Sequence, residues 1–287
     1  MHVLIIGYGE MGQAMERLLA DHHTLRIWQR RDDEPLEVVL EGPQLVLLCV
    51  PAVAHASLLT RLQGLAEHTV VATIAKGLDA AGRTLPEILA ADLPGHLRPG
   101  FIYGPMIAER LQAGQQGYAA VGGMRAEDRA RLVEAFAATQ LHVRPTRDTH
   151  GLAWCALLKN VYTIGISAAV ALELGENVIG ALVVQAIDEM REVVRRVSGD
   201  EVTAIGYGGL GDLVTTFSSA DSNHQRIGRR LALEGPPAGQ GEGVNTLSMI
   251  ARHGRTEARD LPLYAAVDDA VNDRRPIGPA LLAALRH

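Results

Sequence analysis

The sequence predicts an α/β first domain built on a doubly wound parallel sheet, followed by an all-α second domain. Its 287 residues are 47% hydrophobic and 21% charged, a composition typical of globular proteins with a sizeable core. Short apolar runs alternate with helical spacing in the first half, and only long helical stretches follow after about residue 148. We therefore expect one domain at residues 1–148 and a second at residues 149–287.

The expected strands of the first domain are apolar runs rich in β-branched residues. They are residues 3–6, 25–28, 45–50, 69–74, 101–103, 118–121 and 141–143. Helical spacing is found at residues 13–20, 53–65 and 126–137. Strands that alternate with helices indicate a parallel sheet with helices on both faces.

The second domain is predicted to begin with two long helices, at residues 152–174 and 178–197. A glycine-rich turn at 206–212 leads into more helix, and a loop rich in glycine and proline is expected at 234–243. The chain is predicted to end in helices at residues 263–271 and 280–285.

The charge pattern restricts the class of partner. The net charge of −6 argues against a nucleic-acid or membrane-surface binder, and no apolar run is expected to be long enough to span a bilayer.

The N-terminus enters a strand directly, so no signal peptide is expected. Cys49 and Cys155 are interpreted as buried free thiols of a cytoplasmic protein. The scattered histidines predict no metal site.

A glycine-rich fingerprint follows the first strand and opens the first helix. It reads Gly7, Tyr8, Gly9, Glu10, Met11, Gly12. In this context Gly7 allows the tight turn, Gly9 lets the backbone approach a pyrophosphate, and Gly12 allows close helix–strand contact. The phosphates would bind at the helix N-terminus. The sequence therefore predicts a Rossmann-type dinucleotide-binding domain that holds NADP or NAD.

The end of the second strand bears on the choice of cofactor. An acidic residue there would hold the ribose of NAD, but the sequence has Arg30 and Arg31, with Asp32 and Asp33 only afterwards. The two arginines favour the 2′-phosphate of NADP. The alternative is that they are solvated turn residues.

Lysine is rare in this chain. Lysine and arginine together number 27, yet lysine occurs only as Lys76 and Lys159. A lysine can be tuned by burial to give up its proton, whereas an arginine cannot, so both are candidates for proton chemistry. Lys159 lies in an apolar helical run, which suits a general acid for ketone reduction; a half-buried surface lysine is the alternative. Asp212 is expected to be a helix N-cap, a partner for Lys159, or both.

Several ordered motifs beyond the fingerprint resemble the bacterial NAD(P)-dependent glycerol-3-phosphate dehydrogenase family, nearly from end to end. They are Lys76-Gly77, Gly104-Pro105 with Ala108-Glu109, Leu158-Lys159-Asn160, Gly175-Glu176-Asn177, Gly211-Asp212-Leu213 with Thr216, and Glu242-Gly243-Val244 with Thr246.

The resemblance implies a role for each matching residue. Lys159 would be the proton donor and acceptor, with Lys76 and Asp212 beside it in a cleft between the domains. The substrate would be contacted by Lys76, Gly104, Asn160, Asp212, Thr216, Ser222, Asn223 and His224. Beyond the fingerprint and the two arginines, the cofactor would be contacted by Pro51, Lys76, Ala108 and Glu242. The resemblance also implies a cytoplasmic homodimer that serves glycerophospholipid metabolism.

The chain departs from the family pattern where the substrate phosphate should bind. The family has Ser-Arg-Asn where this chain has Ser222-Asn223-His224, so Asn223 stands in place of the arginine that grips the phosphate. Met106 stands where a small hydroxyl residue is common. Arg226, or a charged His224, is a candidate to compensate.

Three functions follow as hypotheses. The first is interconversion of glycerone phosphate and sn-glycerol 3-phosphate with NAD(P)H. The second is a related dehydrogenase of another small keto or hydroxy compound, because the fingerprint and the Lys159-Asn160 pair also resemble β-hydroxyacid dehydrogenases. The third is an NAD(P)-binding regulator without turnover, which the retention of both lysines and Asp212 disfavours.

Overall fold

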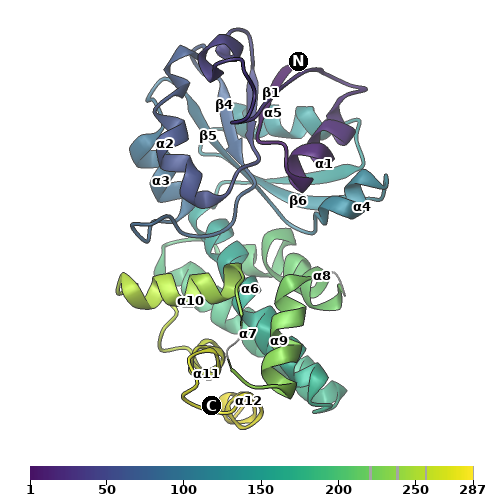
Figure 1. The fold of residues 1–287 in the computed structure, drawn as a ribbon, viewed down its shortest axis with the longest axis vertical. Coiled ribbons are helices and arrows are strands. Elements are labelled where there is room, and N and C mark those ends of the chain that lie inside the picture. Colours follow the sequence, from purple (N-terminus) through teal and green to yellow (C-terminus); the bar gives the residue numbers. More distant parts are fainter. Residues whose placement is uncertain (220–221, 237–238, 256, 287) are drawn as a thin grey trace. The chain divides into compact units, whose positions relative to one another are not determined.

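The chain folds into two compact units, Met1–Thr149 and His150–His287. The structure is a computed structural model that describes residues 1–219, 222–236, 239–255 and 257–286. Figure 1 follows the chain through both units from the N-terminus to the C-terminus.

The first unit is organised around a seven-stranded sheet with the order β2-β1-β3-β4-β5-β6-β7. The strands are β1 (His2–Ile6), β2 (Thr24–Trp28), β3 (Leu45–Leu48), β4 (Val70–Thr73), β5 (Arg98–Tyr103), β6 (Gly117–Gly122) and β7 (Leu141–Thr146). β3 and β4 are buried along their whole length, which explains why both read as continuous apolar runs. Every strand expected from the sequence is present.

The sheet is not wholly parallel, because β5 and β6 pair antiparallel. The prediction of a parallel sheet was wrong at this point. The chain reverses its direction between β5 and β6, and the pairing continues just beyond β5, where the Tyr118 N–H donates to the Pro105 carbonyl at 3.1 Å. A Cβ on Gly104 would lie 2.4 Å from the Tyr118 carbonyl oxygen, so the close approach of β6 requires glycine there.

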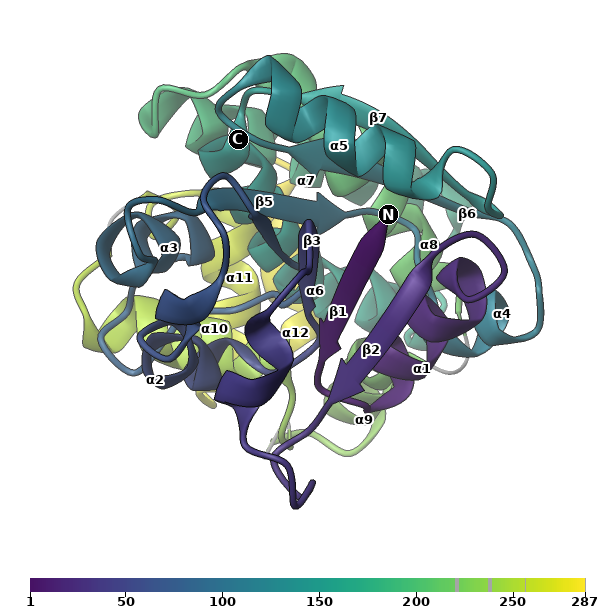
Figure 2. The same ribbon diagram turned by 90° about the horizontal axis from the view of Figure 1, so that it is seen from above.

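Five α-helices cover the sheet. They are α1 (Glu10–Leu19), α2 (His55–Leu59), α3 (Leu85–Asp92), α4 (Ala108–Gln112) and α5 (Ala126–Phe136). α1 packs against α4 and α5, and α2 packs against α3; in Figure 2 these two groups lie on opposite sides of the sheet. The sequence did not predict α3 or α4, which are only eight and five residues long.

The single helix predicted at residues 53–65 is broken into three pieces. A 3-10 turn at Ala52–Ala54, α2, and a 3-10 turn at Leu62–Gly64 replace it. Two hydroxyls within it donate to backbone carbonyls, Ser57 to Ala54 at 3.2 Å and Thr60 to Ser57 at 3.1 Å. Such side-chain bonds compete with the helical pattern and account for the interruption.

The second unit is all-helical in its described residues. Its α-helices are α6 (Thr149–Ala171), α7 (Glu176–Arg196), α8 (Asp212–Ser218), α9 (Asn223–Leu233), α10 (Glu242–Arg252), α11 (Pro262–Val271) and α12 (Ile277–Ala284). α10 was not predicted, since its first residues fall in the expected loop at 234–243. The order of the helices can be followed from teal to yellow in Figure 1.

Residues 206–212 form a helical segment where a turn was predicted. Tyr207–Gly211 is π-helical and runs directly into α8, so Asp212 is the first residue of α8 and not its N-cap. Gly209 permits this geometry, because a Cβ there would lie 2.1 Å from the Ala204 carbonyl oxygen. Asp212 thus lies inside a continuous helical stretch.

α6 is long and apolar enough to cross a membrane, contrary to the expectation that no run would be. In the structure 94% of its most apolar 18-residue stretch is buried. A helix that is apolar on all sides is required when other helices surround it. Cys155 on this helix is buried as predicted, whereas Cys49 in the first unit is partly exposed.

A buried carboxylate fixes the start of α11. Glu189 on α7 accepts hydrogen bonds from the backbone N–H groups of Leu263 at 2.5 Å and Tyr264 at 2.9 Å. Gln185 donates a third bond to the same carboxylate at 2.9 Å. These donors would otherwise be unpaired in the first turn of α11. Burial raises the pKa of Glu189 above its usual value, and the hydrogen bonds oppose that shift.

We predict that Glu189→Leu lowers the free energy of unfolding by about 3 kcal/mol, because the N–H groups of α11 lose their acceptors inside the core. Glu189→Gln keeps an acceptor and should cost less. Urea unfolding measures both, with the exposed Asp188→Asn as control at under about 0.5 kcal/mol. Equal stability of the leucine variant and the wild type would contradict this role.

Candidate functional site

Lys159 lies in the middle of α6 and is 6% exposed. Its Nζ donates to the Thr216 hydroxyl at 2.8 Å and lies 3.4 Å from Oδ1 of Asp212. Burying an ammonium group in an apolar helix costs several kcal/mol unless it is paired and hydrogen-bonded, and these two residues provide both.

α8 presents Asp212 and Thr216 as one unit. They are four residues apart on the same helical face, and the Thr216 hydroxyl donates to the Asp212 backbone carbonyl at 2.6 Å. That bond uses the one hydroxyl hydrogen, so the oxygen faces Lys159 only as an acceptor. Asp212 is 3% exposed, so its carboxylate is held next to Lys159 with little contact with solvent. The ammonium is therefore oriented from two directions.

Asn160, the next residue on α6, links that helix to α10. Its Nδ2 donates to Oε2 of Glu242 at 3.1 Å, which fixes the orientation of the amide. Its Oδ1 is buried and has no hydrogen-bond partner among the described residues. α10 can come this close because a Cβ on Gly243 would lie 2.8 Å from the Asn160 carbonyl oxygen. A buried polar atom without a partner is uncommon, and this oxygen retains its capacity to accept a hydrogen bond.

The segment Ser222-Asn223-His224 is engaged in holding the start of α9 and α10. Ser222 caps α9 by accepting from the Gln225 N–H at 3.4 Å. Nδ2 of Asn223 donates to the Gln240 carbonyl at 3.0 Å, and Nε2 of His224 accepts from the Gly243 N–H at 3.1 Å. Because Nε2 is an acceptor, the ring proton of His224 is on Nδ1 and the ring is uncharged in this arrangement.

In the first unit, the fingerprint forms a cradle that side chains would fill. A Cβ on Gly7 would lie 2.5 Å from the Cys49 carbonyl oxygen, and one on Gly12 would lie 2.2 Å from the Gly7 carbonyl oxygen. Gly9 has open space above it and precedes α1 as its N-cap residue. The arrangement fits a pyrophosphate at the N-terminus of α1, as the sequence predicted for NAD or NADP.

The other fingerprint residues, Tyr8, Glu10 and Met11, have structural contacts. The Tyr8 hydroxyl donates to the Glu16 carboxylate, and this contact raises the pKa of Tyr8 above its usual value. The backbone carbonyl of Glu10 accepts from Gln112 of α4 at 2.8 Å. Met11 packs against the core of the unit. The Tyr8 hydroxyl, the Glu10 carbonyl and the Met11 side chain are therefore already engaged within the protein.

A hollow of 310 Å³ lies beside Gly7 at the ends of β1, β2 and β3. Its lining includes Arg30 but not Arg31. The structure thus places only one of the two arginines expected at the cofactor on this surface.

Lys76 and Pro51 follow neighbouring parallel strands, β4 and β3. The two loops are joined by His55, which the sequence analysis did not single out. Nδ1 of His55 lies 3.1 Å from the Pro51 carbonyl, and Nε2 lies 2.8 Å from the Thr73 hydroxyl. The carbonyl can only accept, so Nδ1 carries the proton and Nε2 accepts from Thr73. The Thr73 oxygen in turn accepts from the Ala75 N–H at 3.0 Å.

His55 therefore fixes the backbone next to Lys76. Its sequence position beside alanines gave no signal of this role; only the buried partners show it. Burial lowers the pKa of His55 below its usual value.

The remaining predicted residues lie on the segment after β5. Gly104 is explained by the close approach of β6, and Ala108 is the buried first residue of α4.

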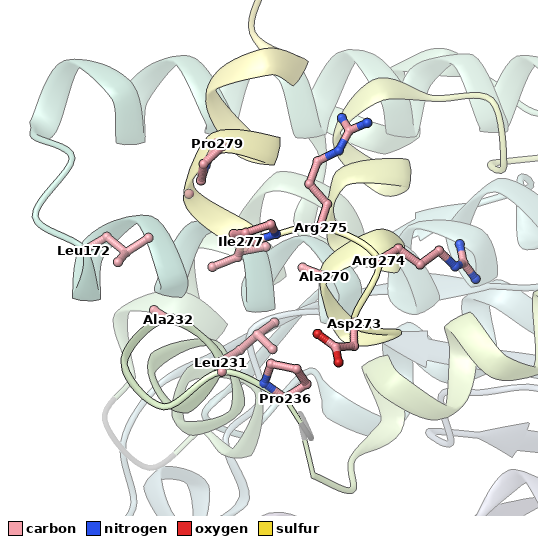
Figure 3. Close-up of a pocket in the computed structure, with 13 residues that line it drawn as sticks. Leu172, Leu231, Ala232, Pro236, Ala270, Asp273, Arg274, Arg275, Ile277 and Pro279 are labelled. Atoms are coloured by element: carbon pink, nitrogen blue, oxygen red, sulfur yellow. The ribbon is translucent and has the colours of Figure 1, made fainter.

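A larger hollow of 420 Å³ lies elsewhere in the second unit, between the ends of α6, α9 and α11 and the start of α12. Figure 3 shows apolar side chains such as Leu231 and Ile277 around it, with Asp273 beside them. None of the predicted catalytic residues lines it. Among the described residues no group of three or more histidine, cysteine, aspartate or glutamate side chains is placed to hold a metal ion.

The two sets of residues define an NAD(P)-dependent dehydrogenase: a dinucleotide cradle in one unit and a paired, buried lysine in the other. Comparison with known proteins agrees. Family models described as the NAD-dependent glycerol-3-phosphate dehydrogenase N-terminus and C-terminus match residues 33–127 and 148–281. A glycerol-3-phosphate dehydrogenase [NAD(P)+] from Synechocystis is 30% identical over 92% of this chain and 87% of its own length. The corresponding protein from Gloeobacter violaceus is 27% identical over 99% and 97%.

Solved structures show the same relationship. A glycerol-3-phosphate dehydrogenase from Coxiella burnetii superimposes with a TM-score of 0.86 at 25% identity and covers 100% of this chain and 99% of its own. A ketopantoate reductase from Ralstonia eutropha has a TM-score of only 0.59 at 18% identity, covers 100% of both chains, and shares the fold alone. The chain belongs to the NAD-dependent glycerol-3-phosphate dehydrogenase family.

We predict that His55→Leu lowers the free energy of unfolding by about 2 kcal/mol at pH 7.5, because two buried hydrogen bonds are lost. The folded-state pKa of His55 is depressed, so its contribution is complete above the unfolded pKa of about 6.5 and is lost as pH falls toward the folded value. The stability difference between the wild type and the variant should therefore shrink from pH 7.5 to pH 5.5. Urea unfolding at both pH values measures this, and a difference independent of pH would refute it.

Proposed function

We propose that this protein reduces the ketone of glycerone phosphate with NAD(P)H to give sn-glycerol 3-phosphate, and catalyses the reverse reaction. The observation that carries the proposal is the buried Lys159 ammonium, held by Asp212 and Thr216. Its presence in a chain with only one other lysine supports a function that arginine cannot perform. Membership of the family supplies the substrate class.

The proton chemistry follows from the geometry around Lys159. NAD(P)H, when bound, supplies the hydride that goes to the carbonyl carbon. The Lys159 ammonium donates a proton to the carbonyl oxygen, and in the reverse direction the amine takes the proton back from the alcohol. Asp212 balances the charge, and Thr216 keeps Nζ in one orientation, so little reorganisation is needed.

Asn160 is proposed to bind a hydroxyl of the substrate. Its buried Oδ1 is an acceptor adjacent in sequence to the acid, while its amide nitrogen is held by Glu242. A hydroxyl donor would satisfy this oxygen, whereas an analogue without the hydroxyl would leave it unpaired. Lys76, just beyond the carboxyl end of β4, is proposed as a second cation for the substrate.

Two further parts of the proposal come from the family resemblance. We expect two copies to associate through the helical unit and the protein to act in the cytoplasm. Size-exclusion chromatography with light scattering tests the first.

The experiment follows NADPH and NADH oxidation at 340 nm with glycerone phosphate, unphosphorylated dihydroxyacetone and a panel of 2-keto acids. Activity on glycerone phosphate should fall by about 10²–10⁴-fold in Lys159→Arg, because arginine keeps the charge but does not release its proton. NADPH affinity, measured by fluorescence, should be unchanged. The exposed Arg191→Lys is the reverse exchange and should retain full activity.

Wild-type activity in the Lys159→Arg variant would remove Lys159 as the acid. Turnover of a 2-keto acid in place of glycerone phosphate would favour the second reading, a related dehydrogenase for another keto compound. NADPH binding without turnover of any ketone would favour a regulator.

Asn223 is the specific observation that bears on the substrate phosphate. In the family an arginine grips the phosphate at this position, and here the asparagine binds the Gln240 carbonyl instead. A guanidinium binds phosphate through two parallel hydrogen bonds, which an amide cannot match.

We predict that Asn223→Arg raises kcat/KM for glycerone phosphate about tenfold, the value of one added charged hydrogen bond, and leaves unphosphorylated dihydroxyacetone unaffected. Asn272→Arg, an exposed exchange at the end of α11, is the matched control. Equal effects of Asn223→Arg on both substrates would show that the phosphate binds away from the start of α9.

A further inference from the structure

The hollow beside Gly7 is lined by a second arginine, Arg61, to which the proposed function assigns no role. It is formed by the ends of three adjacent strands, by α2 and by residues on either side of α2. The lining residues are Ile6, Gly7, Trp28, Gln29, Arg30, Val50, Ala54, Ser57, Leu58 and Arg61. In a doubly wound sheet this edge is where the adenosine half of a dinucleotide binds, next to the pyrophosphate cradle.

Arg61 is held in one position by two independent contacts. Its Nε and Nη2 donate to the two carboxylate oxygens of Glu37 at 2.9 and 3.1 Å. Its guanidinium carbon lies 5.5 Å from the centre of the Trp28 ring, within the range of a cation–π contact. The pair with Glu37 uses one edge of the planar group, so Nη1 is left for a ligand. A guanidinium fixed in this way loses little entropy on binding an anion.

The lining has no carboxylate among the described residues, although acidic residues lie close by in the sequence. Asp32, the first of them, turns toward its own backbone: its Oδ2 accepts from the Gln29 N–H at 2.9 Å. It is therefore committed to closing the turn that carries Arg30. A hollow lined by Arg30 and Arg61, with the Ser57 hydroxyl, suits a dianion better than a ribose hydroxyl.

We propose that Arg61, together with Arg30, binds the 2′-phosphate of a phosphorylated adenine dinucleotide and thereby sets a preference for NADP over NAD. Glu37 and Trp28 are positioning residues that hold the Arg61 guanidinium. This inference rests on the proposed dehydrogenase function, and it assigns cofactor selection to a residue in the segment after β3 as well as to the turn after β2.

The competing interpretation is that Arg61 only covers the Trp28 ring at the surface. In that case its removal would alter packing but not discriminate between phosphorylated and unphosphorylated nucleotides. The two interpretations differ in a binding measurement that needs no turnover.

Isothermal titration calorimetry with 2′,5′-ADP and 5′-ADP as probes, on the full-length protein, makes the test. The wild type should bind 2′,5′-ADP at least about tenfold more tightly than 5′-ADP, as expected for one charged contact or more. Arg61→Gln should lose about tenfold in affinity for 2′,5′-ADP and less than about twofold for 5′-ADP. The control is Arg26→Gln on β2, an exposed arginine paired with Glu34 at 2.7 Å, which should change neither.

Two further variants, Arg61→Lys and Glu37→Gln, separate a loss of the phosphate contact from a general loss of folding. Lysine keeps the charge without the planar edge, so it should retain part of the preference for 2′,5′-ADP. Glu37→Gln should weaken it by loosening the guanidinium. An equal loss for both probes in Arg61→Gln, or no loss for either, overturns the proposal, and thermal unfolding verifies that each variant is folded.

The outcome is separable from that of the proposed function. Arg61-dependent selection of 2′,5′-ADP without any reduction of glycerone phosphate would support the phosphate clamp and reject the proposed substrate. Reduction of glycerone phosphate with no dependence on Arg61 in the binding assay would support the proposed substrate and reject the role of Arg61.

Discussion

The burial of one ammonium group constrains the whole helical unit. α6 is apolar and surrounded, yet it carries Lys159 at its centre. Removing one partner of a buried ion pair commonly costs about 3–5 kcal/mol, while well-packed apolar residues in place of both are often as stable. The pair is therefore a poor device for stability. Its retention makes sense if the charge and the proton are needed for a reaction.

The local structure around that lysine follows from glycines and short polar bridges. Gly209 allows the π-helical turn that runs into α8 and brings Asp212 to the lysine, and Gly243 allows α10 to approach Asn160. Asn160 then joins the lysine's own helix to Glu242. The helix that carries Lys159, the proposed proton donor, is thus linked within one unit to Glu242, which the family resemblance assigns to the cofactor.

The sequence was sufficient where burial alone determines the pattern. The strands were predicted because both faces of β3 and β4 are covered. Asp212 was expected as an N-cap, as a partner for Lys159, or as both, and the structure shows the partner without the cap. The sequence was insufficient where groups far apart in the chain determine the local structure. The antiparallel β5–β6 pair depends on the close approach of β6 at Gly104, and the roles of His55 and Arg61 depend on Thr73, Glu37 and Trp28. None of these partners is marked by spacing or residue type.

The central claim is that Nζ of Lys159 exchanges a proton with the oxygen at the reacting carbon. A crystal structure of the protein with NADP⁺ and sn-glycerol 3-phosphate tests it most directly. The account predicts the C2 hydroxyl within hydrogen-bonding distance of Lys159, about 2.7–3.2 Å, with Asp212 and Thr216 still bound to the lysine. A substrate whose C2 oxygen is held by other groups, with Lys159 paired only to Asp212, would contradict it.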